Sequence, residues 1–210
     1  MAQYQDYGWE NNNFTCAHDY ILSTLIKLLP EDGSLILDVG CGNGAIANYL
    51  IKKGYQVYGI DASASGIQEA NKINPGRFFV QDIETNSLPE ELKILNFSTI
   101  ISTEVIEHLY DPRKFVSFIK KKLIESGGGQ IILSTPYHGY FKNLLLALTG
   151  KLDNHFTALW DGGHIKFWSR KTLACLLKEF DFEIITFYGC GRIPFLWKSM
   201  IIKARIHKID

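Results

Sequence analysis

Residues 35–61, LILDVGCGNGAIANYLIKKGYQVYGID, carry the clearest fold signal in this chain. An apolar strand over residues 35–39 ends in a glycine loop, a helix follows, and a second strand, QVYGID, closes on Asp61. A glycine loop between strand and helix lets a ligand approach the backbone and the helix N-terminus, and an acid about 20 residues further on suits a ribose diol. The segment therefore predicts a binding site for an adenosine-containing cofactor.

The glycine loop by itself is compatible with two classes of cofactor. Gly40, Gly42 and Ala45 satisfy the pattern G-x-G-x-x-G/A, so a nicotinamide or flavin dinucleotide also suits it. Asp38 favours the other class, because a carboxylate beside the loop would repel a pyrophosphate. S-adenosylmethionine has no phosphate and carries an ammonium and a sulfonium, so an acid there helps to bind it.

The segment LDVGCGNG resembles motif I of the class I S-adenosylmethionine-dependent methyltransferases. The resemblance implies that Asp38 favours the cofactor ammonium, Asp61 accepts from the ribose hydroxyls, and Asp82 accepts from the adenine amino group. The glycines would let the methionine part lie against the backbone. The full cofactor-binding set that we predict is Asp38, Gly40, Gly42, Gly44, Asp61, Ala62, Asp82, Ile83 and Thr103.

Size and charge predict one domain over residues 1–210. With 46% hydrophobic and 21% charged residues, the chain can bury one substantial core but has no separate substrate domain, which counts against a two-domain dehydrogenase. The formal net charge is zero, so no global field steers nucleic acid to the protein.

Cysteine usage and the N-terminus predict a cytoplasmic protein. The four cysteines lie far apart without a C-x-x-C pair, which indicates reduced thiols rather than a zinc site or a disulfide framework. The polar N-terminus lacks the apolar run of a signal peptide, and no stretch approaches the roughly 18 apolar residues of a spanning helix.

Alternating helix and strand patterns predict an α/β fold with a doubly wound, mostly parallel sheet and ligands at the carboxyl ends of its strands. Apolar spacing indicates a helix over residues 14–29, and Ser63, Asp111 and Ser169 are expected helix caps. Strands near 183–189 and 200–207 have no helix between them and should be antiparallel neighbours. The arrangement is similar to the seven-stranded Rossmann-like sheet of class I methyltransferases.

Residues 135–168 form a lid-like insertion, and residues 1–30 form an N-terminal arm and helix. In the insertion, Phe141, Leu144, Leu145 and Leu148 make one apolar stripe. Three roles suit this stripe: ordinary core packing, a lid over an apolar substrate, or a peripheral membrane contact through residues 140–160. In the arm, Tyr7 and Trp9 either close over the cofactor or belong to a disordered end.

Glu104, Glu107 and His108 are spaced i, i+3, i+4, which places them on one face if they share a helical turn. Two carboxylates and an imidazole can ligate a divalent cation. The alternative is that Glu107 and His108 make structural hydrogen bonds, since the same motif is common in this superfamily without a metal.

His164, in the segment WDGGHIKFW, extends the possible metal set by resemblance. A histidine there, combined with E-x-x-E-H, is similar to the ubiquinone-biosynthesis O-methyltransferases and to the 2′-O-methyltransferases of small-RNA 3′ ends. In the RNA enzymes the matching residues hold a metal, which implies the set Glu104, Glu107, His108 and His164 here. The chain lacks their extra domains and any basic excess, which puts an RNA 3′ end in doubt as acceptor.

The function we predict is methyl transfer from S-adenosylmethionine to a small or lipid-like acceptor, at an oxygen. A hydroxyl acceptor needs a base, and His108 or His138 is placed to supply it; His138 is otherwise a solvated loop histidine. Two other classes stay open. They are an NAD(P)-binding oxidoreductase and a non-catalytic binding module with a methyltransferase-like fold.

Overall fold

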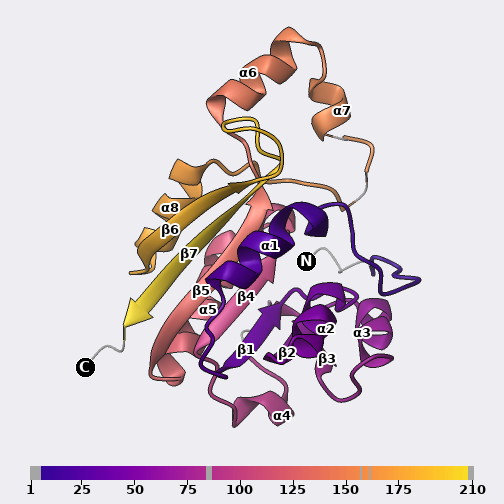
Figure 1. Cartoon of the computed structure of the whole chain (residues 1–210), viewed down its shortest axis with the longest axis vertical. Helices are drawn as coiled ribbons and strands as arrows, with labels where there is room; N and C mark the ends of the chain where they lie inside the picture. The colour runs from indigo at the N-terminus through magenta and orange to yellow at the C-terminus, as the bar shows by residue number, and fades with distance from the viewer. Residues whose placement is uncertain (1–5, 84–86, 157, 161, 208–210) are drawn as a thin grey trace.

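A computed structural model describes residues 6–83, 87–156, 158–160 and 162–207, and its strands form one seven-stranded sheet (Figure 1). The strands are β1 (Leu35–Val39), β2 (Gln56–Asp61), β3 (Phe78–Val80), β4 (Thr99–Thr103), β5 (Gly128–Pro136), β6 (Glu183–Cys190) and β7 (Ser199–His207). The helices are α1 (His18–Leu28), α2 (Ala45–Lys52), α3 (Ala64–Asn71), α4 (Glu90–Lys93), α5 (Pro112–Glu125), α6 (Tyr140–Leu148), α7 (Leu152–Phe156) and α8 (Arg170–Glu179), with a 3₁₀ turn, η2 (Ile106–His108).

The strand order is β3-β2-β1-β4-β5-β7-β6. Strands β1 to β5 pair in parallel, and β7 lies antiparallel between β5 and β6. The predicted doubly wound sheet with an antiparallel closing pair is therefore confirmed. Because β1 lies between β2 and β4, the strand order reverses there, and such a switch point is where open α/β sheets bind ligands.

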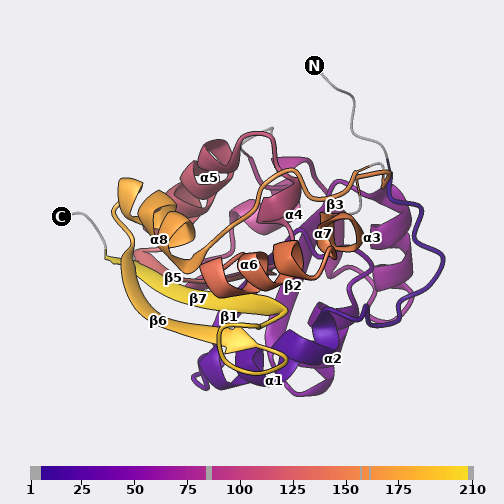
Figure 2. The same ribbon diagram turned by 90° about the horizontal axis from the view of Figure 1, so that it is seen from above.

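Two helical layers cover the sheet because successive side chains of a strand point to opposite faces. Helices α5 and α8 cover one face and α1 and α2 the other (Figure 2). On β1, Leu37 joins the α5 side of the core and Ile36 joins the α1 side. The same alternation recurs on β7 with Ile202 and Ile201. Both faces of the central strands are thus apolar, as expected of a buried parallel sheet.

The three predicted helix caps are present. The Ser63 hydroxyl accepts from Gly66 N at 3.0 Å at the start of α3, and the Asp111 carboxylate accepts from Lys114 N at 3.0 Å at the start of α5. Ser169 forms a capping box with Thr172 at the start of α8. One expected boundary was wrong, since α1 begins at His18 and Phe14 lies outside it, against the His18 ring.

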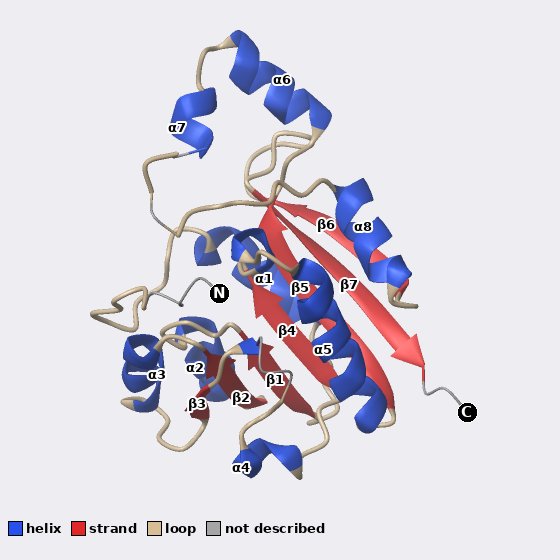
Figure 3. Cartoon of the chain, turned by 180° about the vertical axis from the view of Figure 1, so that it is seen from behind, coloured by secondary structure: helices blue, strands red, loops and turns tan. Residues whose placement is uncertain are grey.

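Helices α6 and α7 stand beyond the carboxyl ends of the strands (Figures 1 and 3). The apolar stripe of α6 faces outward, with Phe141 61% exposed and Leu148 77% exposed. Core packing, one of the three roles proposed for this stripe, is therefore wrong. Among the described residues, every helix is too short or too polar to cross a membrane.

Candidate cofactor site and metal centre

The glycine loop turns sharply at the end of β1, and two of its glycines have no room for a side chain. Gly40 has a φ of 79°, and a Cβ there would lie 2.5 Å from Val105 Cγ2. Gly44 has a φ of 71° at the start of α2, and a Cβ there would overlap the Cβ of Ala70. Positive φ and close approach both require glycine at these two positions.

Asp61, the acid predicted to bind ribose, already holds the glycine loop in place. Its Oδ2 accepts from Gly42 N at 2.7 Å, and its Oδ1 accepts from Ser63 N at 2.8 Å. Each carboxylate oxygen can accept a second hydrogen bond, so these contacts leave capacity for a diol. Burial raises the pKa of Asp61 despite the two backbone donors.

Asp38 is buried next to this loop and lacks a partner. Its side chain is 1% exposed, and Oδ1 has no hydrogen-bond partner among the residues that the structure describes. Burial, with a smaller contribution from Asp61, raises the pKa of Asp38 to about 8. A buried unpaired carboxylate is costly, and a cation beside it removes that cost. The arrangement fits an ammonium group, such as that of S-adenosylmethionine.

The remaining predicted cofactor residues lie at neighbouring strand ends. Ala62 follows β2, Thr103 ends β4, and Asp82 and Ile83 follow β3. Ile83 is partly buried against the main core, while the Asp82 side chain is exposed. All of them lie at the same edge of the sheet as the glycine loop, where the strand order reverses.

The N-terminal arm is hydrogen-bonded to the start of α3 through Asp6. The Asp6 carboxylate accepts from Ser63 Oγ at 2.8 Å and from Ser65 N at 3.0 Å, and it also accepts from Ser65 Oγ. These hydrogen bonds hold the pKa of Asp6 well below its usual range, and the bond from the Ser65 hydroxyl contributes most. An acid at a helix N-terminus also meets the positive end of the helix dipole.

Further along the arm, Trp9 lies over the glycine loop. Its ring is 3.0 Å from the position that a Cβ on Gly42 would take, and its backbone N–H donates to Ser65 Oγ at 2.9 Å. Asn43 in the loop donates from Nδ2 to the carbonyls of Asn11 and Asn13 at 2.9 and 3.0 Å. The described part of the arm is thus in contact with the glycine loop and α3, and closure of Tyr7 and Trp9 over a bound cofactor stays a prediction.

The predicted single helical turn for Glu104, Glu107 and His108 was wrong. Glu104 lies directly after β4 with a φ of 55°, and only Ile106–His108 form the 3₁₀ turn. The Glu104 carboxylate accepts from Ser134 Oγ at 2.8 Å and from Ser199 Oγ at 3.3 Å. These contacts with β5 and β7 direct Glu104 to the sheet, and burial raises its pKa to about 7.

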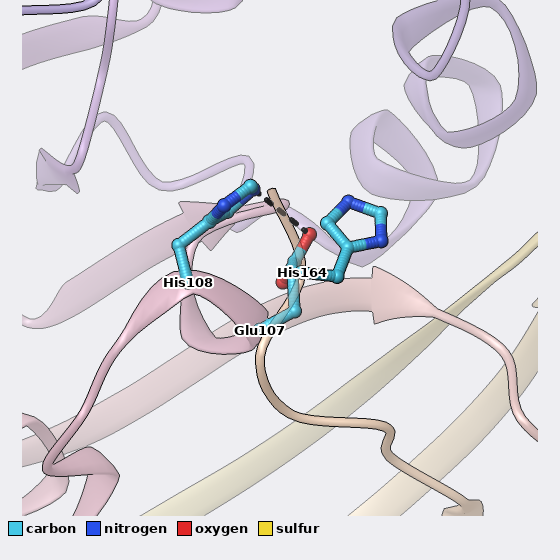
Figure 4. A group of neighbouring side chains, drawn as sticks. All are labelled: Glu107, His108 and His164. Atoms are coloured by element: carbon cyan, nitrogen blue, oxygen red, sulfur yellow. Dashed lines mark ion pairs between the residues drawn. The ribbon is translucent and has the colours of Figure 1, made fainter. Parts of the chain in front are cut away.

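Glu107, His108 and His164 nevertheless converge (Figure 4). Each offers one ligand atom, and these atoms lie within 4.8 Å of one another. The insertion brings His164 to this position because Ile165 N and Lys166 N donate to the Glu107 carbonyl at 2.9 and 3.0 Å. Three of the four predicted metal ligands thus come together, and Glu104 lies outside the group.

The orientation of this group suits a divalent ion. His108 Nδ1 lies 2.8 Å from the Gly162 carbonyl, which assigns the proton to Nδ1 and leaves the Nε2 lone pair for the cluster. Burial, with a smaller contribution from the nearby His108, lowers the pKa of His164 to about 4, so the His164 imidazole is neutral near pH 7. Glu107 Oε2 accepts from Thr135 Oγ1 at 2.9 Å, whereas Oε1 has no partner in the described chain. Two imidazoles and a buried carboxyl oxygen are a suitable donor set for a transition metal.

His138, the second candidate base, follows β5 and is only 7% exposed, so the solvated-loop alternative is wrong. Its backbone N–H donates to the Trp168 carbonyl at 2.9 Å, and its ring packs against Phe156 and Phe167. Burial, and then Lys142, lowers the pKa of His138 to about 3. So low a basicity makes His138 a poor general base near neutral pH.

Known proteins resemble this chain in sequence and in fold. The sequence profile of the family described as "Methyltransferase domain" matches residues 15–186. The ubiquinone biosynthesis O-methyltransferase of Paracidovorax citrulli is 32% identical over 127 residues, covering 59% of this chain and 52% of the relative. The protein of the same name from a Ruegeria species is 28% identical over 198 residues, covering 89% and 78%. The chain spans about half the length of the first relatives that it matches.

Two solved structures share the fold. An S-adenosylmethionine-dependent methyltransferase from Mesorhizobium loti has a TM-score of 0.66 at 19% identity, covering 89% of this chain and 97% of that one. The magnesium protoporphyrin IX methyltransferase of Synechocystis, solved with bound S-adenosylhomocysteine, has a TM-score of 0.61 at 21% identity, covering 88% and 78%. At these identities the likeness establishes the fold alone.

Proposed function

The chain belongs to the class I S-adenosylmethionine-dependent methyltransferases, and from that premise we propose that it methylates an oxygen of a small or lipid-like acceptor. The observation that carries the proposal is Asp38, a buried and unpaired carboxylate directly before the glycine loop. A dinucleotide phosphate would be repelled there, whereas an ammonium would be held. Family membership sets aside the NAD(P)-binding oxidoreductase.

S-adenosylmethionine supplies, when bound, a methyl group on a positively charged sulfur. In our proposal Asp38 holds its ammonium, the glycine loop accommodates its methionine part, and Asp61 accepts from its ribose hydroxyls. Asp82 and Ile83 bind its adenine, with Ala62 and Thr103 alongside. The chain's main contribution to an in-line displacement is to align the two reactants and to exclude water. The arm over Gly42 and the insertion over the strand ends serve that second purpose.

On the acceptor side, we assign His108 as the group that removes the hydroxyl proton. Its Nε2 is free of protein donors in the tautomer that the Gly162 carbonyl selects. In the alternative scheme, Glu107, His108 and His164 would hold a divalent ion, which would lower the pKa of an acceptor hydroxyl; His108 Nε2 would then be a ligand and not the base. Glu104 is not needed as a ligand in this scheme, because it already accepts from two serine hydroxyls.

The names of the relatives support an oxygen acceptor, since several are O-methyltransferases of ubiquinone biosynthesis. The zero net charge does not favour an RNA 3′ end. A non-catalytic module would have no use for the convergence of Glu107, His108 and His164 beside the strand ends. We further propose that residues 1–210 form one domain, with residues 135–168 as its lid.

We also propose a cytoplasmic location with peripheral membrane contact through α6. Its exposed stripe ends in Leu148, and Phe195 of the β6–β7 loop contacts Phe141 with ring centroids 6.0 Å apart. Exposed Lys151 and Arg192 add positive charge beside this apolar surface, which suits anionic lipid headgroups. Flotation with anionic vesicles should recover the wild type but not Leu148→Glu. Equal recovery of both would contradict this contact.

Product analysis tests the central proposal. The protein is incubated with S-adenosylmethionine and one acceptor at a time, taken from catechols, hydroquinones and RNA oligonucleotides. Mass spectrometry then measures the masses of the products. We expect one added methyl group on an oxygen of a phenolic acceptor, and none after Asp61→Ala under limiting cofactor. Methylation of RNA alone, or cofactor binding without any methylated product, would contradict the proposal.

A further inference from the structure

The N-terminal arm contacts both of the residues that hold Asp61, the acid at the end of β2. Asp61 accepts two backbone hydrogen bonds, from Gly42 N at 2.7 Å and from Ser63 N at 2.8 Å. Trp9 of the arm lies against Gly42. Asp6 of the arm accepts from the Ser63 hydroxyl at 2.8 Å. The arm, which runs beside α3 and α2 in Figure 2, can therefore act on the Asp61 carboxylate through both of its donors.

At Gly42 the arm, the glycine loop and α3 meet at close range. The Trp9 ring lies 3.0 Å from the position that a Cβ on Gly42 would take. A Cβ on Gly66 of α3 would lie 2.6 Å from the Gly42 carbonyl oxygen and 3.0 Å from Trp9 Cδ1. Because protein interiors are close-packed, removing the indole would leave a gap beside Gly42. The Trp9 ring thus limits how far the Gly42 N–H can move away from Asp61.

The next residue of the loop joins it to the arm by hydrogen bonds. Asn43 is 1% exposed, and its Nδ2 donates to the carbonyls of Asn11 and Asn13 at 2.9 and 3.0 Å. Its Oδ1 accepts from Ala45 N at 3.2 Å. A side-chain amide has two N–H donors, so the arm uses both of them. The arm is therefore fixed to the loop directly after Gly42.

At the second donor, Asp6 joins the arm to the start of α3. The Ser63 hydroxyl caps α3 by accepting from Gly66 N at 3.0 Å, and it donates its only hydrogen to Asp6. Asp6 also accepts from Ser65 N at 3.0 Å. These bonds orient the turn whose Ser63 N–H donates to Asp61.

We propose that Asp6 and Trp9 are positioning residues, which orient the Asp61 carboxylate for the ribose hydroxyls of S-adenosylmethionine. The inference rests on the proposed function in one respect, which is that Asp61 binds the ribose. Contacts that fix a binding group in its productive orientation reduce the cost of ordering it when the ligand arrives. Loss of either arm contact should therefore weaken the hydrogen bonds to the ribose and leave the contacts with the rest of the cofactor unchanged.

Calorimetry with S-adenosylhomocysteine and with its 2′-deoxy analogue isolates the ribose contact. Wild type should bind the analogue about tenfold more weakly, because the analogue lacks one hydrogen bond to a charged acceptor. In Trp9→Leu and in Asp6→Ala, S-adenosylhomocysteine should bind about fivefold more weakly and the analogue as before, so the discrimination should fall to about twofold. Glu10→Gln, at an exposed acid of the same arm, is the control and should keep the wild-type discrimination.

Gly66→Ala tests the same contact from the side of α3, with the arm unchanged. Its new Cβ would be too close to the Gly42 carbonyl and would displace Gly42, so the discrimination between the two ligands should fall again. Alanine favours a helix more than glycine does, so α3 should still form.

Amide exchange in the protein without ligand tests the arm contact independently. The Gly42 N–H should exchange about tenfold faster in Trp9→Leu than in wild type, because its hydrogen bond to Asp61 opens more often. Amides of the paired strands β1 and β4 should exchange at unchanged rates, which checks that the variant is folded.

Equal weakening of both ligands by Trp9→Leu would overturn the inference, because the arm would then act on the whole cofactor and not through Asp61. A discrimination that survives in both Trp9→Leu and Asp6→Ala would also overturn it. Failure of wild type to bind S-adenosylhomocysteine would instead refute the proposed function, in which case exchange at Gly42 alone decides whether the arm orients Asp61.

Discussion

Replacing Asp38 by Asn should stabilise the protein and weaken its binding of S-adenosylmethionine. Burial raises the pKa of Asp38 from 3.8 to about 8 in the folded chain without ligand. The unfolded chain ionises this acid near pH 4, so folding of the wild type loses stability as the pH rises from about 4 to about 8. The amide is neutral throughout, so the variant does not lose this stability.

The magnitude follows from the pKa difference, since one pKa unit corresponds to about 1.4 kcal/mol. With the folded value near 8, the gain of Asp38→Asn over wild type has an upper limit of about 4 kcal/mol at pH 7. It falls to roughly 1.5 kcal/mol at pH 5 and approaches zero near pH 4. Asp19→Asn, at an exposed acid in the first turn of α1, is the control for removing one carboxylate.

Urea denaturation without cofactor, repeated between pH 4 and 8, measures the difference in unfolding free energy. Calorimetry with S-adenosylmethionine on the same proteins should show at least a tenfold loss of affinity in Asp38→Asn, because the ammonium loses its counter-charge. The reasoning would be refuted if the stability difference between Asp38→Asn and wild type did not depend on pH. It would also be refuted if both proteins bound S-adenosylmethionine equally well, since Asp38 would then not be the counter-charge of the ammonium.

Three further outcomes are expected. Gly44→Ala should lower the unfolding free energy by about 2–4 kcal/mol, because φ is positive there and the new Cβ would overlap Ala70. Gly54→Ala is the control: φ is positive but the surrounding space is open, so the loss should be about 1 kcal/mol. Thermal denaturation of both variants measures the difference. Asp6→Ala should release the arm, and limited proteolysis should then cleave near residues 6–13 much faster than in wild type. Glu107→Gln should weaken Co²⁺ binding at least tenfold in a spectroscopic titration, while Glu104→Gln, outside the group, should change it little.

The sheet and its caps could be predicted because their causes are local. The apolar run of β1, the alternating pattern of β7, the Ser63 and Asp111 caps, and the lack of a helix between the last two strands are all visible in short stretches of sequence. The glycine loop was predictable for the same reason, since Gly40 and Gly44 adopt backbone conformations that other residues avoid.

The site was predicted less completely because its geometry depends on distant partners. Glu104 was expected beside Glu107, but serines on β5 and β7, 30 and 95 residues away in sequence, bind its carboxylate. The group of Glu107, His108 and His164 was anticipated through resemblance, and only the folded insertion could confirm that His164 reaches it. The contact of His155 with His138 was missed, since nothing in the local sequence indicates that α7 brings the two rings together.

The arm and the insertion meet at an aromatic contact, in which Tyr7 stacks on Trp9 and meets the Trp160 ring edge-on with centroids 6.1 Å apart. In the proposed arrangement, the arm covers the cofactor end of the site and the insertion covers the acceptor end. Binding of the cofactor should therefore favour binding of the acceptor, and the reverse, which is heterotropic cooperativity between two substrates. An aromatic pair contributes about 0.5–1.5 kcal/mol, which limits the coupling to roughly 2- to 13-fold. Such an enzyme favours an ordered kinetic sequence, in which the donor enters first and its spent form leaves last.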